Sequence, residues 1–166
     1  MKLNTLQLSI TFSFFMNKKA LATLSCIILS IIVFQSCSHI NRETNISSHG
    51  DTESHNQGRN CMECHKNGGP GEGAFTVAGT VYQKNGNSTY PNATVKLYTG
   101  QDATGILKAT IEVDGLGNFY TTEKIDFIEP LFPSVTGTET EHMPSALVVG
   151  QCNSCHGVTE DRIEVK

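Results

Sequence analysis

The sequence contains no tryptophan, and only 17% of its 166 residues are charged and 38% apolar. The apolar share is below that of an average globular domain, which predicts a small core. A surplus of basic residues is also missing, because 12 Lys and Arg stand against 16 Asp and Glu. Nucleic-acid binding therefore loses its main electrostatic support. Every acidic residue follows Ser36, so the part of the chain after it is acidic and favours a basic partner.

The N-terminal region has the features of an export signal. The run Ala20–Phe34 is apolar and uncharged, and two lysines precede it. Its length is short for a membrane span and typical of a signal-peptide core. The run leads to Ser36 and Cys37, which resemble the processing site of bacterial lipoproteins; this implies cleavage before Cys37 and a lipid on its thiol. Residues 1–36 are therefore predicted to be a signal peptide, with Met16 as an alternative start. An uncleaved anchor and an ordinary signal peptide are the alternatives.

Residues 37–57 are predicted to be the lipidated cysteine and a polar tether. The stretch is almost free of large apolar side chains, so it cannot bury enough surface to fold alone. The protein is then expected to be exported and anchored to a bacterial membrane, facing the periplasm or the cell surface. The tether would hold the folded domain off the membrane.

Apart from Cys26 in the signal region and Cys37 at the processing site, the cysteines all lie in one short motif that occurs twice. The two copies are Cys61-Met62-Glu63-Cys64-His65 and Cys152-Asn153-Ser154-Cys155-His156. Both read C-x-x-C-H, the attachment pattern of c-type haem. Two thiols at this spacing reach the two vinyl groups of one porphyrin, and the histidine that follows lies under the iron as its proximal ligand. The sequence therefore predicts two covalent haem c groups.

Other cysteine chemistries explain the motifs less well. A single zinc site would have to join two pairs separated by far more than the spacing of a ribbon or finger. Disulfides suit an exported domain, but a C-x-x-C loop is small and the two histidines would have no role. Thiol–disulfide exchange would require a thioredoxin-like βαβ pattern, which neither motif has around it.

The motifs resemble those of small multihaem c-type cytochromes. The resemblance covers the motifs and their flanks only, Ser54–Gly73 and Met143–Gly157. It implies thioether bonds from Cys61, Cys64, Cys152 and Cys155, and proximal coordination by His65 and His156. Haem-binding segments are predicted at 58–73 and 131–166. The chain between them departs from an ordinary cytochrome c because it is not helical.

Residues 74–130 alternate between apolar and polar side chains in the manner of β-strands. Strands are predicted at Phe75–Tyr82, Ala93–Thr99, Leu107–Val113 and Asn118–Glu123, with edge pieces at Lys124–Ile128 and Ala146–Val149. The stretches Ala78–Val81, Pro91–Leu97 and Asp114–Phe119 resemble the carboxypeptidase-regulatory or transthyretin-like β-sandwich. The expected fold class is mainly β: a small antiparallel β-sandwich flanked by two loop-rich haem-binding segments.

The second axial ligand of each iron is open at this point. Candidates outside the motifs are His39, His49, His55, His142 and Met143. His55 stands six residues before Cys61 in a glycine-containing loop that can fold back. His142 and Met143 precede Cys152 and are restrained by Pro144, so one of them is expected to coordinate, with Met143 preferred and His142 the alternative. The match between ligand and haem, including a crossed one, stays open.

The leading functional prediction is electron transfer by an exported, lipid-anchored dihaem c-type cytochrome. Its partners would be redox proteins, other cytochromes among them, and the membrane through the anchor, with self-association into a longer haem chain left open. A dihaem peroxidase or reductase is a second class, but the sequence offers no cluster of acid–base groups for it. A surface lipoprotein whose sandwich recognises a partner or a sugar is the third.

Overall fold

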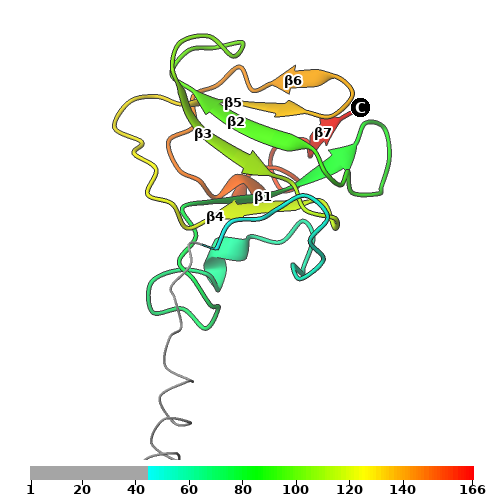
Figure 1. Cartoon of the computed structure of the whole chain (residues 1–166), viewed down its shortest axis with the longest axis vertical. Helices are drawn as coiled ribbons and strands as arrows, with labels where there is room; N and C mark the ends of the chain where they lie inside the picture. Colours follow the sequence, from blue (N-terminus) through cyan, green and yellow to red (C-terminus); the bar gives the residue numbers. More distant parts are fainter. Residues whose placement is uncertain (1–44) are drawn as a thin grey trace, which may run out of the picture. The chain divides into compact units, whose positions relative to one another are not determined.

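The structure is a computed structural model, and it describes residues 45–166 (Figure 1). The predicted signal peptide at 1–36, the alternative start Met16, the lipidation residue Cys37 and His39 lie outside the described residues. Within the described residues no helix is long and apolar enough to cross a membrane. The strands are β1 (Val77–Gln83), β2 (Thr94–Tyr98), β3 (Leu107–Glu112), β4 (Asn118–Thr121), β5 (Phe132–Thr136), β6 (Thr140–His142) and β7 (Ile163–Val165), and two 3₁₀ turns are η1 (Cys61–Glu63) and η2 (Cys152–Ser154).

The strands form two sheets that pack face to face, which confirms the mainly β sandwich. One sheet has the order β4-β1-β7 and the other the order β3-β2-β5-β6. Figure 1 shows the four-stranded sheet above β1 and β4. All strand pairs are antiparallel except β1 with β7, which run parallel. The sandwich is therefore antiparallel in the main, with one parallel edge contributed by the C-terminal strand.

The core lies between the two sheets and follows the predicted alternation. Val77 and Val81 of β1 are fully buried, and Val95 and Leu97 of β2 are almost completely buried. Phe119 of β4 is the largest of the fully buried side chains. Because a strand presents alternate residues to one face, these positions meet across the sandwich. Burying each large side chain stabilises the fold by about 1.5–3 kcal/mol.

The sandwich extends beyond the predicted boundary at residue 130. Strands β5, β6 and β7 all lie in the stretch 131–166 that the sequence assigns to the second haem segment. Their alternation is short and interrupted by proline and glycine, so the pattern is weak in the sequence. The expected edge strand Lys124–Ile128 is irregular, and Ala146–Val149 contributes a single bridge between Leu147 and Leu131.

The prediction of a tether at 37–57 is wrong for residues 45–57, the part of it that the structure describes. The Ser47 amide donates to the Tyr120 carbonyl at 3.0 Å, so residues 45–47 lie along the outer edge of β4. The Ser47 side chain is buried, and its hydroxyl bonds to the carbonyls of Glu112 and Tyr120. A short polar segment can join a sheet edge because its backbone hydrogen bonds, rather than apolar area, hold it there.

Candidate haem sites

Both C-x-x-C-H motifs fold as the same short turn. In the first, the amides of Cys64 and His65 donate to the Cys61 carbonyl at 3.2 and 2.9 Å. In the second, the amides of Cys155 and His156 donate to the Cys152 carbonyl at 3.2 and 3.0 Å. A turn of this kind brings the two cysteines and the following histidine to one region of surface, which is the arrangement that attachment of one porphyrin requires.

Each motif histidine is held through the same ring nitrogen. His65 Nδ1 lies 2.7 Å from the Glu72 carbonyl oxygen, and His156 Nδ1 lies 2.6 Å from the Asp161 carbonyl oxygen. A carbonyl oxygen only accepts hydrogen bonds, so Nδ1 is the donor, and in the neutral ring Nε2 is then the nitrogen with a free lone pair. This is the protonation state and orientation found in histidines that bind a metal through Nε2.

The first cysteine of each motif is more enclosed than the second. Cys61 and Cys152 are partly buried, whereas Cys64 and Cys155 are exposed. Burial raises the pKa of the Cys61 thiol, and burial raises that of Cys152 to about 12. All four are free thiols in the structure.

A cavity of about 840 Å³ adjoins the first motif. It is lined by Cys61, Cys64 and His65 and also by His55 from the loop before the motif. The His55 and His65 rings have centroids 5.8 Å apart. The two rings are tilted by 39° to each other. Their separation is close to the roughly 6 Å between centroids of two imidazoles bound to one metal through bonds of about 2 Å. The cavity volume is within the range of cofactor pockets.

An aromatic stack supports the first motif from the sandwich side. The His65 ring lies parallel to Phe75 with 4.2 Å between centroids, and Phe75 stacks on Tyr120 of β4 at 4.8 Å. Burial, reinforced by the carboxylates of Asp114 and Asp51, raises the pKa of the Tyr120 hydroxyl, which therefore stays protonated at neutral pH. The stack restrains the plane of the His65 ring in addition to its Nδ1 bond.

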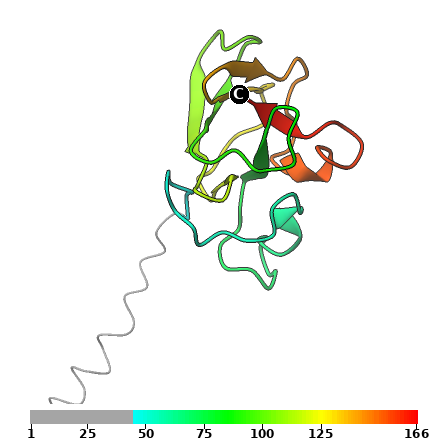
Figure 2. The same ribbon diagram turned by 90° about the vertical axis from the view of Figure 1, so that its right-hand side faces the viewer.

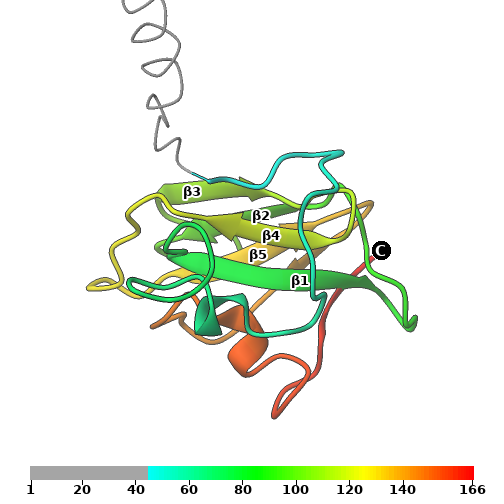
Figure 3. The ribbon, with the colours of Figure 1, turned by 90° about the horizontal axis from the view of Figure 1, so that it is seen from below.

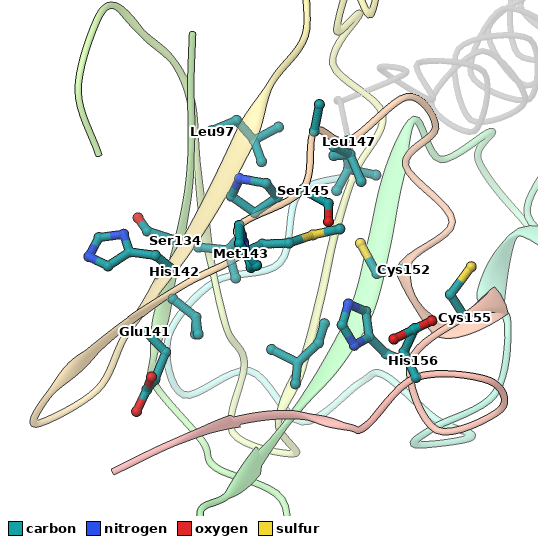
Figure 4. A pocket seen from close by; sticks show the side chains of 18 of the residues that line it. Leu97, Ser134, Glu141, His142, Met143, Ser145, Leu147, Cys152, Cys155 and His156 are labelled. Carbon is teal, nitrogen blue, oxygen red and sulfur yellow. The ribbon is translucent and has the colours of Figure 1, made fainter. Parts of the chain in front are cut away.

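A second cavity, of about 570 Å³, adjoins the second motif. Its lining includes Cys152, Cys155, His156 and Met143, together with apolar side chains of the sandwich. Figure 4 shows the Met143 side chain directed into this cavity, toward Cys152 and His156. A thioether sulfur that could serve as a ligand therefore lies in the same cavity as His156.

The other candidate ligands are placed less favourably. His142 is the last residue of β6 and is exposed, and in Figure 4 its ring points away from Cys152. Successive residues of an extended segment point to opposite sides, so Met143 faces inward where His142 faces outward. His49 bonds through Nε2 to the Ala93 carbonyl at 2.9 Å and lines neither cavity.

The two motifs lie side by side on strand β1. The Ala78 amide donates to the Gly150 carbonyl at 2.9 Å just before η2, and the Phe75 amide donates to the His65 carbonyl at 3.0 Å. Figures 2 and 3 show η1 and η2 next to each other beside β1. Gly79 permits this approach, because a Cβ there would lie 2.9 Å from the Cys152 Cβ. The sequence left the relative position of the motifs open, and the structure brings them together.

Several residues at the sites carried no motif signal in the sequence. Arg59 lines the first cavity and Arg162 the second, and the Arg162 guanidinium lies 4.5 Å from the Tyr82 ring centroid. In the sequence, Asn153 is recognisable only as one of the two variable residues between the cysteines of the second motif. The only signal in the sequence that could have indicated Arg59 and Arg162 as site residues was their position close to the two motifs.

A zinc site and a haem site make different demands on the protein's side chains. Tetrahedral zinc in proteins has four side-chain ligands within one coordination sphere. The described residues contain no group of three or more His, Cys, Asp or Glu side chains that could hold a metal ion. Haem iron requires only two axial side chains, because the porphyrin supplies the other donors.

Comparison with protein-family models, with curated proteins and with solved structures gave no match to this chain.

Proposed function

We propose that this protein is an electron-transfer protein that carries two covalent haem c groups. The observation that supports this most is the doubled site: two C-x-x-C-H motifs with the same turn, each with its histidine held through Nδ1 and each beside a cavity lined by a further side chain that could bind iron. When bound, haem supplies one-electron cycling between ferrous and ferric iron. The protein's residues attach it, coordinate it and set its surroundings.

At the first site, Cys61 and Cys64 form the thioether bonds. His65 and His55 are the axial ligands, which is supported by their shared cavity and the 5.8 Å between their rings. Two histidines give an iron a relatively low reduction potential. The bond from Nδ1 to the Glu72 carbonyl makes His65 a stronger electron donor, which acts in the same direction.

At the second site, Cys152 and Cys155 form the thioether bonds and His156 is the proximal ligand. Met143 would be the distal ligand: both His142 and Met143 line the cavity of this motif, but the Met143 side chain points toward Cys152 while the His142 ring points away from it. A thioether raises the potential relative to a second histidine. With haem bound, the two sites would therefore differ in reduction potential, the second site having the higher one.

One arginine at each cavity suits the carboxylate groups that haem carries. Arg59 lines the first cavity and Arg162 the second. A guanidinium pairs well with carboxylates, so we assign these residues to haem propionates. The chain has more acidic than basic residues, so its surface carries net negative charge. Such a surface favours a redox partner that has basic groups near its own cofactor.

The lipoprotein assignment rests on the sequence at Ser36 and Cys37. An exported chain with a lipid on Cys37 would work at a membrane surface, among other redox proteins. Cys37→Ala is expected to move the haem-loaded protein from the membrane fraction to the soluble exported fraction, measured by fractionation and immunoblotting. Unchanged membrane association would favour an uncleaved anchor.

The function is tested by an optical redox titration of the full chain, produced with haem-attachment machinery. We expect reversible one-electron steps at two potentials and two low-spin haems. Covalent haem without reversible reduction would contradict electron transfer, and a high-spin ferric haem that turns over peroxide would favour the enzyme alternative.

A further inference from the structure

The loop that carries His55 is pinned at three points. The Gly58 amide donates to the Thr80 hydroxyl at 2.9 Å, and Asn153 Nδ2 donates to the Arg59 carbonyl at 2.9 Å. Asn118 Nδ2 donates to the Ser54 hydroxyl at 2.9 Å and approaches the His55 carbonyl at 3.4 Å. The anchoring residues belong to β1, β4 and the second motif, and none belongs to the loop itself.

Those anchoring residues form one buried, fully paired network. The Thr80 hydroxyl donates to Asn118 Oδ1 at 2.7 Å and accepts from Asn153 Nδ2 at 2.9 Å, in addition to the Gly58 amide. Asn153 Oδ1 accepts from the Thr80 amide at 3.1 Å. The three side chains are between 1% and 4% exposed. A buried network in which every group is paired is rigid, and losing one member leaves others unsatisfied.

Asn153 occupies a variable position of the second motif, yet it reaches the first. Haem attachment requires the cysteines and the histidine, and it sets no demand on the two residues between the cysteines. The adjacent Ser154 bonds only within its own turn, to the Gln151 carbonyl at 2.6 Å. A second cross-link runs from Asn60 Nδ2 to Gln151 Oε1 at 3.3 Å. The contact of Asn153 with Arg59 therefore couples two sites that are far apart in the sequence.

We propose that Asn153 is a positioning residue for the distal ligand of the first haem. Through Thr80 and the Arg59 carbonyl, the second motif fixes the loop that carries His55 and so keeps His55 on the first iron. This inference rests on the proposed function, because it concerns coordination at the first haem site. It makes distal coordination at the first site depend on the intact fold of the second.

The test measures how often His55 leaves the iron in the full, haem-loaded chain. Cyanide replaces a distal ligand after that ligand dissociates, so its binding rate at the bis-histidine haem reports the dissociation. Asn153→Leu is expected to raise this rate roughly tenfold, the equivalent of losing about one buried hydrogen bond. Ser154→Ala, in the same turn, is the control and is expected to leave the rate unchanged.

A second pair of variants keeps the test decisive if Asn153→Leu fails to fold. Thr80→Val removes the hydroxyl that holds the Gly58 amide and is expected to raise both the cyanide rate and the hydrogen exchange of that amide. Thr80→Ser retains a hydroxyl and is expected to restore both. Equal rates in the wild type, Asn153→Leu and Thr80→Val would overturn the inference and leave the dihaem function intact. Absence of covalent haem from the wild type would overturn both.

Discussion

The imidazole ring of His65 lies flat against the ring of Phe75, with 4.2 Å between centroids and 3° between planes. Together with the Nδ1 bond to the Glu72 carbonyl, this contact restrains the plane of the His65 ring and would fix its rotation about a bond to haem iron. We expect Phe75→Leu to loosen the ring plane and to broaden or shift the electron paramagnetic resonance signal of the first ferric haem. Phe127→Leu, a partly buried core change without ring stacking, is the control. An unaltered signal in Phe75→Leu would show that the stack has no influence on the ligand.

His55 is predicted to be the distal ligand of the first haem. His55→Ala is expected to convert that haem to a high-spin species that binds cyanide rapidly, because among the described residues the cavity is lined by no histidine or methionine other than His55 and the proximal candidate His65. The second haem should keep its spectrum. His49→Ala removes a histidine of the same N-terminal segment that lines neither cavity, and it should change nothing. Conversion of the second haem by His55→Ala would instead indicate a crossed arrangement.

Met143 is predicted to coordinate the second haem. A ferric haem with a methionine ligand has a weak sulfur-to-iron absorption band in the near infrared, which a bis-histidine haem lacks. Met143→Ala is expected to abolish the band and to lower the potential of that haem. His142→Ala is the matched neighbour and should preserve both. If the wild type has no such band and His142→Ala disturbs the spectrum, the assignment of the two residues is reversed.

The Cys152 thiol gives the haem-free chain a specific sensitivity to alkali. Burial raises its pKa from 9.0 to about 12 in the folded chain, so the folded state holds this proton more tightly than the unfolded state. The resulting stabilisation is complete below about pH 9 and is lost as the pH rises toward 12. Urea unfolding of haem-free chains should therefore show a steeper alkaline loss of stability in Cys155→Ala than in Cys152→Ala. Equal losses would mean that the Cys152 sulfur is solvated.

The sheet and the core were predictable because their signal is local. Val95 and Leu97 alternate with the polar Thr94, Lys96 and Tyr98, and Val77 and Val81 lie four residues apart on one face of β1; the structure buries all four apolar side chains. Strands β5 and β7 were not predicted, because β5 contains Pro133 and β7 is only three residues long. Such short strands are specified by the neighbours they pair with rather than by their own pattern.

The two C-x-x-C-H motifs are visible in the sequence because their spacing is local, and haem attachment by their cysteines stays a prediction. The proximity of the two motifs was not, because it depends on long-range contacts such as Asn153 with Arg59 and Gly150 with Ala78. Nor could the sequence choose between His142 and Met143, since that choice depends on which way β6 faces at its last residue. Asn118 and Thr80 gave no signal, because a buried polar residue is recognised only from its partners.

The most direct measurement is the haem content of the mature chain. The full-length protein is expressed with haem-attachment machinery, and its intact mass is compared with a pyridine haemochrome assay on the same sample. We expect the mass of the processed polypeptide plus two haem groups, and two haems for each chain after denaturation. A chain that carries no covalent haem, with Cys61, Cys64, Cys152 and Cys155 recovered as thiols, disulfides or zinc ligands, would contradict the proposed function.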